Sequence, residues 1–150
     1  MPALQLDSGE VLTEGPAIVQ YIADQAPAKA LAPANGSIER YRLQSWLGFI
    51  GTELHKSFSP LFNPDTAAEA KAAAVANLEK RLGYTDGQLA GKSFQLGEGF
   101  SVADAYLFTV LSWTGYVGVD LSRWPNLAAF QARVGARPAV QAALKAEGLA

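Results

Sequence analysis

Residues 99–104 read Gly-Phe-Ser-Val-Ala-Asp, and the apolar run that they open organises the whole chain. Ser101 can cap a helix through its hydroxyl, and Asp104 can accept a hydrogen bond from the Ser101 backbone N–H. We therefore expect Ser101 and Asp104 to form a structural capping box, with Asp in place of the commoner Glu. The helix is predicted to run from Val102 to about Thr114, with Asp104 as its only charge. Because it is apolar on nearly every face, we expect it to lie buried at the centre of an all-helical domain.

The composition favours an ordered globular protein and disfavours several functions. Hydrophobic residues make up 49% of the 150 residues and charged residues 17%, and a chain of this length can bury ~70% of its unfolded surface. The net charge of -2, without a cluster of Lys or Arg, disfavours nucleic acid as a partner. With no cysteine and a single histidine, we expect no disulfide, no protein thiolate and no metal site. No signal peptide, membrane span or lipidation motif is recognisable, so we expect a cytoplasmic location and no membrane partner.

The first 26 residues are predicted to form a hairpin followed by a helix. Strands at residues 3–6 and 11–12 flank the turn-forming residues 7–10, Asp-Ser-Gly-Glu. A helix from Pro16 to about Gln25 follows, because Pro suits the first helical position and apolar residues recur there at helical spacing. Residues 27–36 are rich in Pro and Ala. This composition predicts a linker between an N-terminal unit, residues 1–26, and a second domain, residues 37–150.

The second domain is predicted to be helical throughout. One helix is expected from Ile38 to about Ser57. The next follows the break at residues 59–64 and is expected to be capped by a box of Thr66 and Glu69. After the central helix, two further helices are expected, over residues 127–134 and from Val140 to near Gly148.

The first candidate binding site is the segment Glu14-Gly15-Pro16, which joins a strand to the start of a helix. The N–H groups of Gly15 and Ala17 and the positive end of the helix dipole would attract an anion, and the Glu14 carboxylate could pair with an ammonium group. A zwitterionic amino-acid end would satisfy both. The alternative is that Glu14 only complements the helix dipole, an effect worth ~0.3–1 kcal/mol.

The second candidate is the segment of residues 52–56, Thr-Glu-Leu-His-Lys. His55 could stabilise a thiolate or another anion with the help of Lys56, although such a pair is often only a solvated surface pair. At helical spacing, His55 ends a face of small and polar residues that a ligand or another helix could approach: Ser45, Gly48, Thr52 and His55. Five aromatic residues could line an apolar pocket or simply pack in the core: Phe58, Phe62, Tyr106, Trp113 and Tyr116.

Taken together, these segments resemble the cytosolic glutathione S-transferases, and within them the bacterial beta class. The motifs that carry the resemblance occur in order along all 150 residues: 2–4, 12–24, 53–62, 100–106 and 137–140. The resemblance implies a mainly α protein, in which an all-helical C-terminal domain follows a β-hairpin and helix left from a thioredoxin-like domain, usually in a homodimer. It also implies that roughly the first 50 residues of the family, with the catalytic cysteine of the beta class, are absent here.

The resemblance further implies roles for individual residues. His55 is expected to be catalytic, because it matches a residue linked to thiol chemistry. The glutathione contacts carried over are Met1, Pro2, Glu14, Gly15, Thr52, Glu53, Leu54 and His55, the last four reaching across the dimer. Tyr106 and Trp113 resemble positions that line the site of the electrophile. The chain departs from the family pattern at Gly48, where an Asn is familiar, and at Pro16, which replaces the more usual Val.

The function expected from the resemblance is detoxification, in which the glutathione thiolate is conjugated to a small hydrophobic electrophile. Glutathione is the co-substrate in this reaction, and no metal is needed. Because the principal catalytic residue would lie in the absent part, we expect little activity from this chain alone. Two alternatives remain: a non-catalytic helical module for binding or dimerisation, and a fragment without a function of its own.

Overall fold

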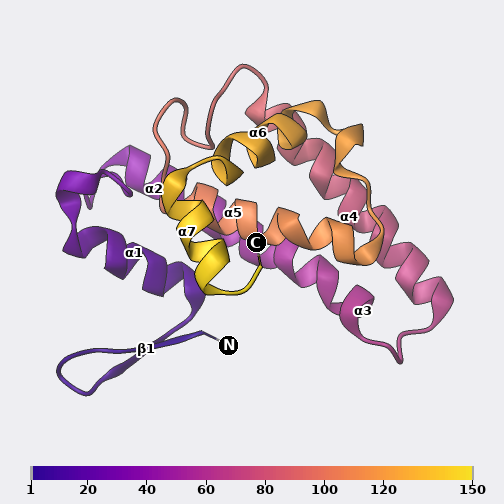
Figure 1. Cartoon of the computed structure of the whole chain (residues 1–150), viewed down its shortest axis with the longest axis horizontal. Helices are drawn as coiled ribbons and strands as arrows, with labels where there is room; N and C mark the ends of the chain where they lie inside the picture. Colours follow the sequence, from indigo (N-terminus) through magenta and orange to yellow (C-terminus); the bar gives the residue numbers. More distant parts are fainter. Residues whose placement is uncertain (1, 150) are drawn as a thin grey trace.

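The structure is a computed structural model that describes residues 2–149, and it is mainly helical (Figure 1). Its strands and α-helices are β1 (Ala3–Gln5), β2 (Val11–Thr13), α1 (Gly15–Gln25), α2 (Ile38–Phe49), α3 (Ser59–Phe62), α4 (Ala68–Leu89), α5 (Val102–Ser112), α6 (Pro125–Gly135) and α7 (Pro138–Ala146). Tighter or wider helical turns lie between them: η1 (Pro27–Lys29), η2 (Ile50–Leu54), η3 (His55–Phe58), η4 (Trp113–Val117) and η5 (Leu121–Arg123). Figure 1 shows the hairpin projecting from one end of the helical body. The predicted fold class is confirmed.

The hairpin forms as the sequence predicts. β1 and β2 pair antiparallel with Leu4 opposite Leu12. Both leucines are half-buried while their strand neighbours are exposed, because one face of the pair packs toward α1. Gly9 closes the turn with a φ of 87°, a left-handed value that glycine adopts without strain. Within residues 2–149 the sheet consists of these two strands alone.

Arg40 of α2 fixes α1 and the connector to the helical domain. Its side chain is buried, and its two terminal nitrogens donate to the carboxylate oxygens of Asp24 on α1 at 2.8 and 2.6 Å. Its Nε donates to Gln20 Oε1 at 3.2 Å, and one terminal nitrogen also donates to the Pro33 carbonyl at 2.9 Å. One side chain thus joins three segments. We propose that the chain divides into an N-terminal unit, residues 1–26, a linker, residues 27–36, and a helical domain, residues 37–150.

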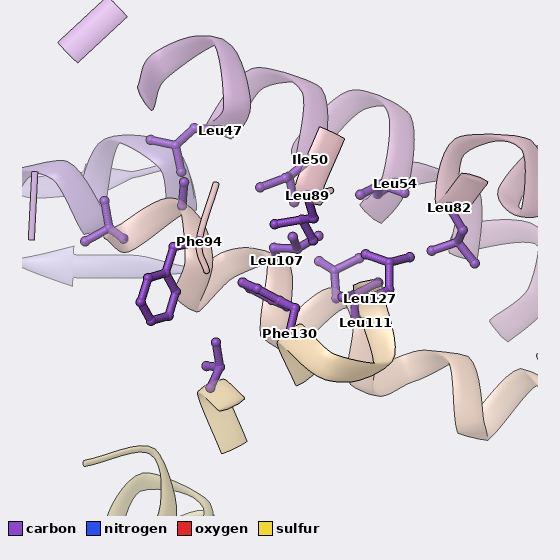
Figure 2. Packing of buried hydrophobic residues seen from close by; sticks show 14 of the residues in the cluster. Leu47, Ile50, Leu54, Leu82, Leu89, Phe94, Leu107, Leu111, Leu127 and Phe130 are labelled. Atoms are coloured by element: carbon purple, nitrogen blue, oxygen red, sulfur yellow. The ribbon is translucent and has the colours of Figure 1, made fainter. Parts of the chain in front are cut away.

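The hydrophobic core lies where α2, α4, α5 and α6 meet (Figure 2). Leu47 of α2, Leu82 of α4, Leu107 of α5 and Phe130 of α6 are each at most 1% exposed. These residues lie on the apolar faces that helical spacing predicts, so burial of those faces explains why the four helices assemble.

The start of α5 is held by the predicted capping box of Ser101 and Asp104, which is confirmed. Asp104 Oδ2 accepts from the Ser101 N–H at 2.8 Å and from its hydroxyl at 2.7 Å, and Oδ1 accepts from the Gln95 N–H at 2.7 Å. Burial raises the pKa of Asp104, and these hydrogen bonds oppose that rise. The box therefore ties the loop before α5 to the helix and has a structural role, as expected.

Two predicted helix boundaries are wrong. The helix expected from Ile38 to Ser57 is interrupted after Phe49 by the π turn η2, in which the His55 N–H donates to the Ile50 carbonyl five residues earlier. The box of Thr66 and Glu69 does not form, since α4 begins at Ala68 without a side-chain cap.

Before α4, residues 63–66 form a turn in place of the expected helix cap. The Asn63 side chain accepts from the Asp65 N–H at 3.0 Å, and the Asn63 carbonyl accepts from the Thr66 N–H at 3.3 Å. Thr66 therefore belongs to a turn of the kind that Asn stabilises, and not to a helix cap.

The expected burial of α5 at the centre of the helical domain is confirmed on one side of the helix only. Ala105, Thr109 and Ser112 are exposed along one side of the helix. They border a cavity of about 900 Å³ between α5 and α7, with Val140 and Leu144 on the α7 side. α5 is therefore central in the core on one side and open on the other. In the described part of the chain, no helix is both long enough and apolar enough to cross a membrane.

Candidate functional site

The turn before α1 places Glu14 in a strained backbone conformation. Glu14 has φ 71° and ψ 115°, a combination that costs a residue with a side chain of order 1–3 kcal/mol. Its carbonyl accepts from the N–H groups of both Ala17 and Ile18 at 3.0 Å, while its side chain makes no cap and is exposed. Ala17 is therefore not the free anion donor that the sequence suggested, and the donor left at this helix start is Gly15.

Pro2 lies directly against this turn. A Cβ placed on Gly15 would come within 3.6 Å of Pro2 Cγ. Two residues that the sequence assigns to one site, 13 positions apart, are therefore neighbours in space. Met1, also assigned to the site, lies outside the described residues, and so does the peptide bond between Met1 and Pro2.

The π turn η2 places His55 against α5 and η4. Its Nδ1 lies 2.8 Å from the Tyr106 hydroxyl of α5. Trp113 of η4 packs against the same imidazole at right angles, with ring centroids 4.7 Å apart. His55 thus contacts two aromatic residues, from α5 and η4, and remains exposed to solvent.

The pKa values of Tyr106 and His55 are both shifted from their ordinary values. Burial raises the pKa of Tyr106, and the negative charge of Glu14 raises it further. Partial burial lowers the pKa of His55. Both groups are therefore neutral near pH 7, the phenol protonated and the imidazole uncharged. The negative charge of Glu14 thus acts on Tyr106, and we treat the turn before α1 and the His55–Tyr106 pair as parts of one candidate site.

The residues that precede His55 are engaged elsewhere. The Thr52 hydroxyl donates back to the Gly48 carbonyl at 3.1 Å, and Thr52 lines a shallow groove with Lys56. The Glu53 carboxylate pairs with Arg81 at 2.7 Å. Leu54 is fully buried in the core, so a ligand could reach it only through the backbone. The predicted contacts of Thr52, Glu53 and Leu54 with a ligand stay predictions.

The small-residue face expected on the 38–57 helix is only partly formed. Ser45, Gly48 and Thr52 are exposed, and nothing lies within 4 Å of a Cβ built on Gly48. His55 leaves this face because the π turn rotates it toward α5. Sequence reasoning missed this rotation, and the only signal for it is the pair Gly51-Thr52, two weak helix formers in mid-helix.

The aromatic set divides between core and surface. Phe58 is buried, and Phe62 stacks on it with ring centroids 5.9 Å apart. Trp113 meets both edge-on and also borders the 900 Å³ cavity together with the exposed Tyr116. Trp113 and Phe62 thus offer an apolar surface beside His55. Within residues 2–149, no three His, Asp or Glu side chains gather in a way that could hold a metal ion.

Comparison with known proteins agrees with this fold. The family model for the glutathione S-transferase C-terminal domain matches residues 49–138. Glutathione S-transferase GstA of Escherichia coli O157:H7 is 50% identical over 149 residues, which are 99% of this chain and 74% of that protein. The chain belongs to the glutathione S-transferase family.

Two solved structures of glutathione S-transferases are similar to this chain over its whole length. A sphingomonad glutathione S-transferase complexed with glutathione has a TM-score of 0.95 and 57% identity, over 100% of this chain and 75% of that one. The beta-class glutathione S-transferase of Sphingomonas chungbukensis has a TM-score of 0.96 and 55% identity, over the same shares. The chain is thus a beta-class-like member that spans about three quarters of these relatives. Its helical body corresponds to their all-helical domain, and its hairpin and α1 to a part of the thioredoxin-like domain.

Proposed function

We propose that this chain binds glutathione and takes part in its conjugation, through the thiol sulfur, to electrophiles. The observation that carries the proposal is the contact between His55 and Tyr106, whose phenol also experiences the negative charge of Glu14. In the reaction, the glutathione thiolate would attack an electrophilic carbon, form a C–S bond and expel a leaving group such as a halide. The proposal is supported by the family and by the sphingomonad relative that was solved with glutathione.

The two ends of glutathione would meet different parts of the site. The ammonium of the γ-glutamyl end would pair with the exposed Glu14 carboxylate, and its carboxylate would meet the Gly15 N–H at the positive end of α1. In place of the reach across the dimer that the resemblance implied, His55 would lie at the sulfur of the glutathione held by Glu14 of the same chain, where a donor stabilises the thiolate. The electrophile would lie on the apolar surface of Trp113 beside His55.

We also make proposals on the activity, oligomeric state, location and biological role of the protein. The 150 residues contain no cysteine, so they supply no protein thiol, and we propose little transferase activity for this chain alone. We propose in addition that the chain acts as a homodimer in the cytoplasm and that its reaction serves detoxification. A conjugation assay with an aryl halide tests the activity, and a turnover equal to that of the relatives would contradict the low value.

Calorimetric titration with glutathione tests the binding. Glu14→Gln removes the carboxylate charge but keeps the size of the side chain. Loss of a charge-assisted hydrogen bond is worth about 1.5–3 kcal/mol, so we expect binding to weaken at least tenfold. Glu10→Gln, at an exposed position of the hairpin turn, is the matched control and should bind like the wild type. Equal binding by Glu14→Gln, or no binding by the wild type, would contradict the proposal.

A further inference from the structure

The contact between His55 and Tyr106 leaves one ring nitrogen of the histidine without a protein partner. Nδ1 lies 2.8 Å from the phenol oxygen, and within residues 2–149 Nε2 has no hydrogen-bond partner. The packing of Trp113 against the imidazole restrains its rotation. A ligand beside His55 therefore meets Nε2. Whether Nε2 donates or accepts a hydrogen bond depends on which ring nitrogen carries the proton.

The position of the proton follows from the relative acidity and basicity of the Tyr106 phenol and the His55 imidazole. A phenol is a stronger acid than a neutral imidazole N–H, and an imidazole nitrogen is a stronger base than a phenol oxygen. Within the described residues, Nδ1 is also the only hydrogen-bond partner of the Tyr106 hydroxyl. The hydrogen bond therefore runs from the Tyr106 O–H to Nδ1 of His55, and the imidazole proton is left on Nε2.

We propose that Tyr106 is a positioning residue that holds His55 in the tautomer with hydrogen on Nε2 and presents that N–H to the sulfur of the bound thiol. The second half of the inference rests on the proposed function, while the first half concerns the free protein. Tyr106 thereby gains a role other than the wall of the electrophile site that the sequence suggested. A histidine held this way donates to a thiolate and does not act as its base.

The tautomer can be measured directly because His55 is the only histidine in the sequence. In a long-range ¹H–¹⁵N NMR spectrum of the chain at a pH where His55 is neutral, the two ring nitrogens have distinct shifts. We expect Nε2 to be the protonated nitrogen almost exclusively. In Tyr106→Phe, which keeps the ring and loses the hydroxyl, the ratio of the two tautomers should change by about fivefold toward the mixture of a free histidine.

Tyr41→Phe is the matched control, since Tyr41 is 58% exposed on α2. It should leave the tautomer ratio unchanged. Either a wild-type protein with hydrogen on Nδ1 or a ratio that Tyr106→Phe does not alter would overturn the positioning role. Thermal unfolding of both variants verifies that each is folded at the temperature of the spectra.

The contact with sulfur is tested by the ultraviolet absorbance of the glutathione thiolate as a function of pH in the bound state. We expect the thiol of bound glutathione to need a higher pH to ionise in Tyr106→Phe than in the wild type, with little change in affinity. An unchanged profile would overturn the sulfur contact. If glutathione does not bind at all, the proposed function fails, whereas the tautomer of the free protein still decides the role of Tyr106.

Discussion

Arg40→Ala is the substitution that tests most sharply how the N-terminal segment is held. The guanidinium makes four hydrogen bonds, two of them to Asp24, one to Gln20 and one to the Pro33 carbonyl. Removing one partner of a buried pair costs about 3–5 kcal/mol. Asp24 is 36% exposed and can turn to water, so we expect about 3 kcal/mol. For a domain of this size the melting temperature should fall by roughly 6–12 °C.

Urea unfolding followed by circular dichroism measures this loss. Arg42→Ala on the same helix is the control, because Arg42 is 66% exposed and its pairing with Glu39 is loose at 3.6 Å. We expect it to change the free energy of unfolding by less than about 0.5 kcal/mol. In a double-mutant cycle, Arg40→Ala and Asp24→Ala should couple by about 1–3 kcal/mol. Equal stabilities of Arg40→Ala and Arg42→Ala would show that Arg40 does not hold α1 and the connector in place.

Three further predictions concern the turn, an ion pair and the core. The free energy of unfolding should be about 1 kcal/mol higher for Glu14→Gly than for Glu14→Ala, because only Gly adopts the positive φ of residue 14 without strain. Equal melting temperatures of the two variants would contradict the strain. The hydrogen bonds from Arg40 lower the pKa of Asp24 from 3.8, so their stabilisation is present above about pH 4 and is lost as the pH falls through the lowered pKa. Urea unfolding from about pH 3 to 6 should show a smaller loss on acidification in Asp24→Asn than in the wild type, and the same loss in both would count against the pair. Phe130→Ala should lower the free energy of unfolding by about 3–5 kcal/mol, because Phe130 is buried in the core. Tyr116→Ala, at a 75% exposed position, should lower it by less than about 1 kcal/mol. Similar losses in the two variants would refute the placement of the core.

Local sequence signals predicted the features that local physics determines. The hairpin follows from a turn cluster between two short apolar runs. The capping box follows from Ser101 and Asp104 at the required spacing, and the core positions Leu127, Phe130 and Val134 follow from helical periodicity. In each case the residues that decide the structure lie within one or two turns of one another, so the pattern can be read without knowledge of the rest of the fold.

The features that the sequence did not reveal depend on residues far apart in the chain. The hydrogen bond between His55 and Tyr106 spans 51 positions and exists only because the π turn rotates His55 toward α5. Arg40 carries the ordinary sequence signature of an exposed helix residue, and its burial depends on Asp24, which is 16 positions away. The conformation of Glu14 has no local signal either, since a glycine would be expected at a positive φ.

We propose that the turn before α1 and the His55–Tyr106 pair form one glutathione site. Titration of the ¹⁵N-labelled chain with glutathione, followed by NMR, reports on both places at once. We expect the Gly15 amide and the His55 ring nitrogens to shift together and to give the same dissociation constant. Shifts at only one of the two places, or shifts confined to the cavity between α5 and α7, would contradict a single site.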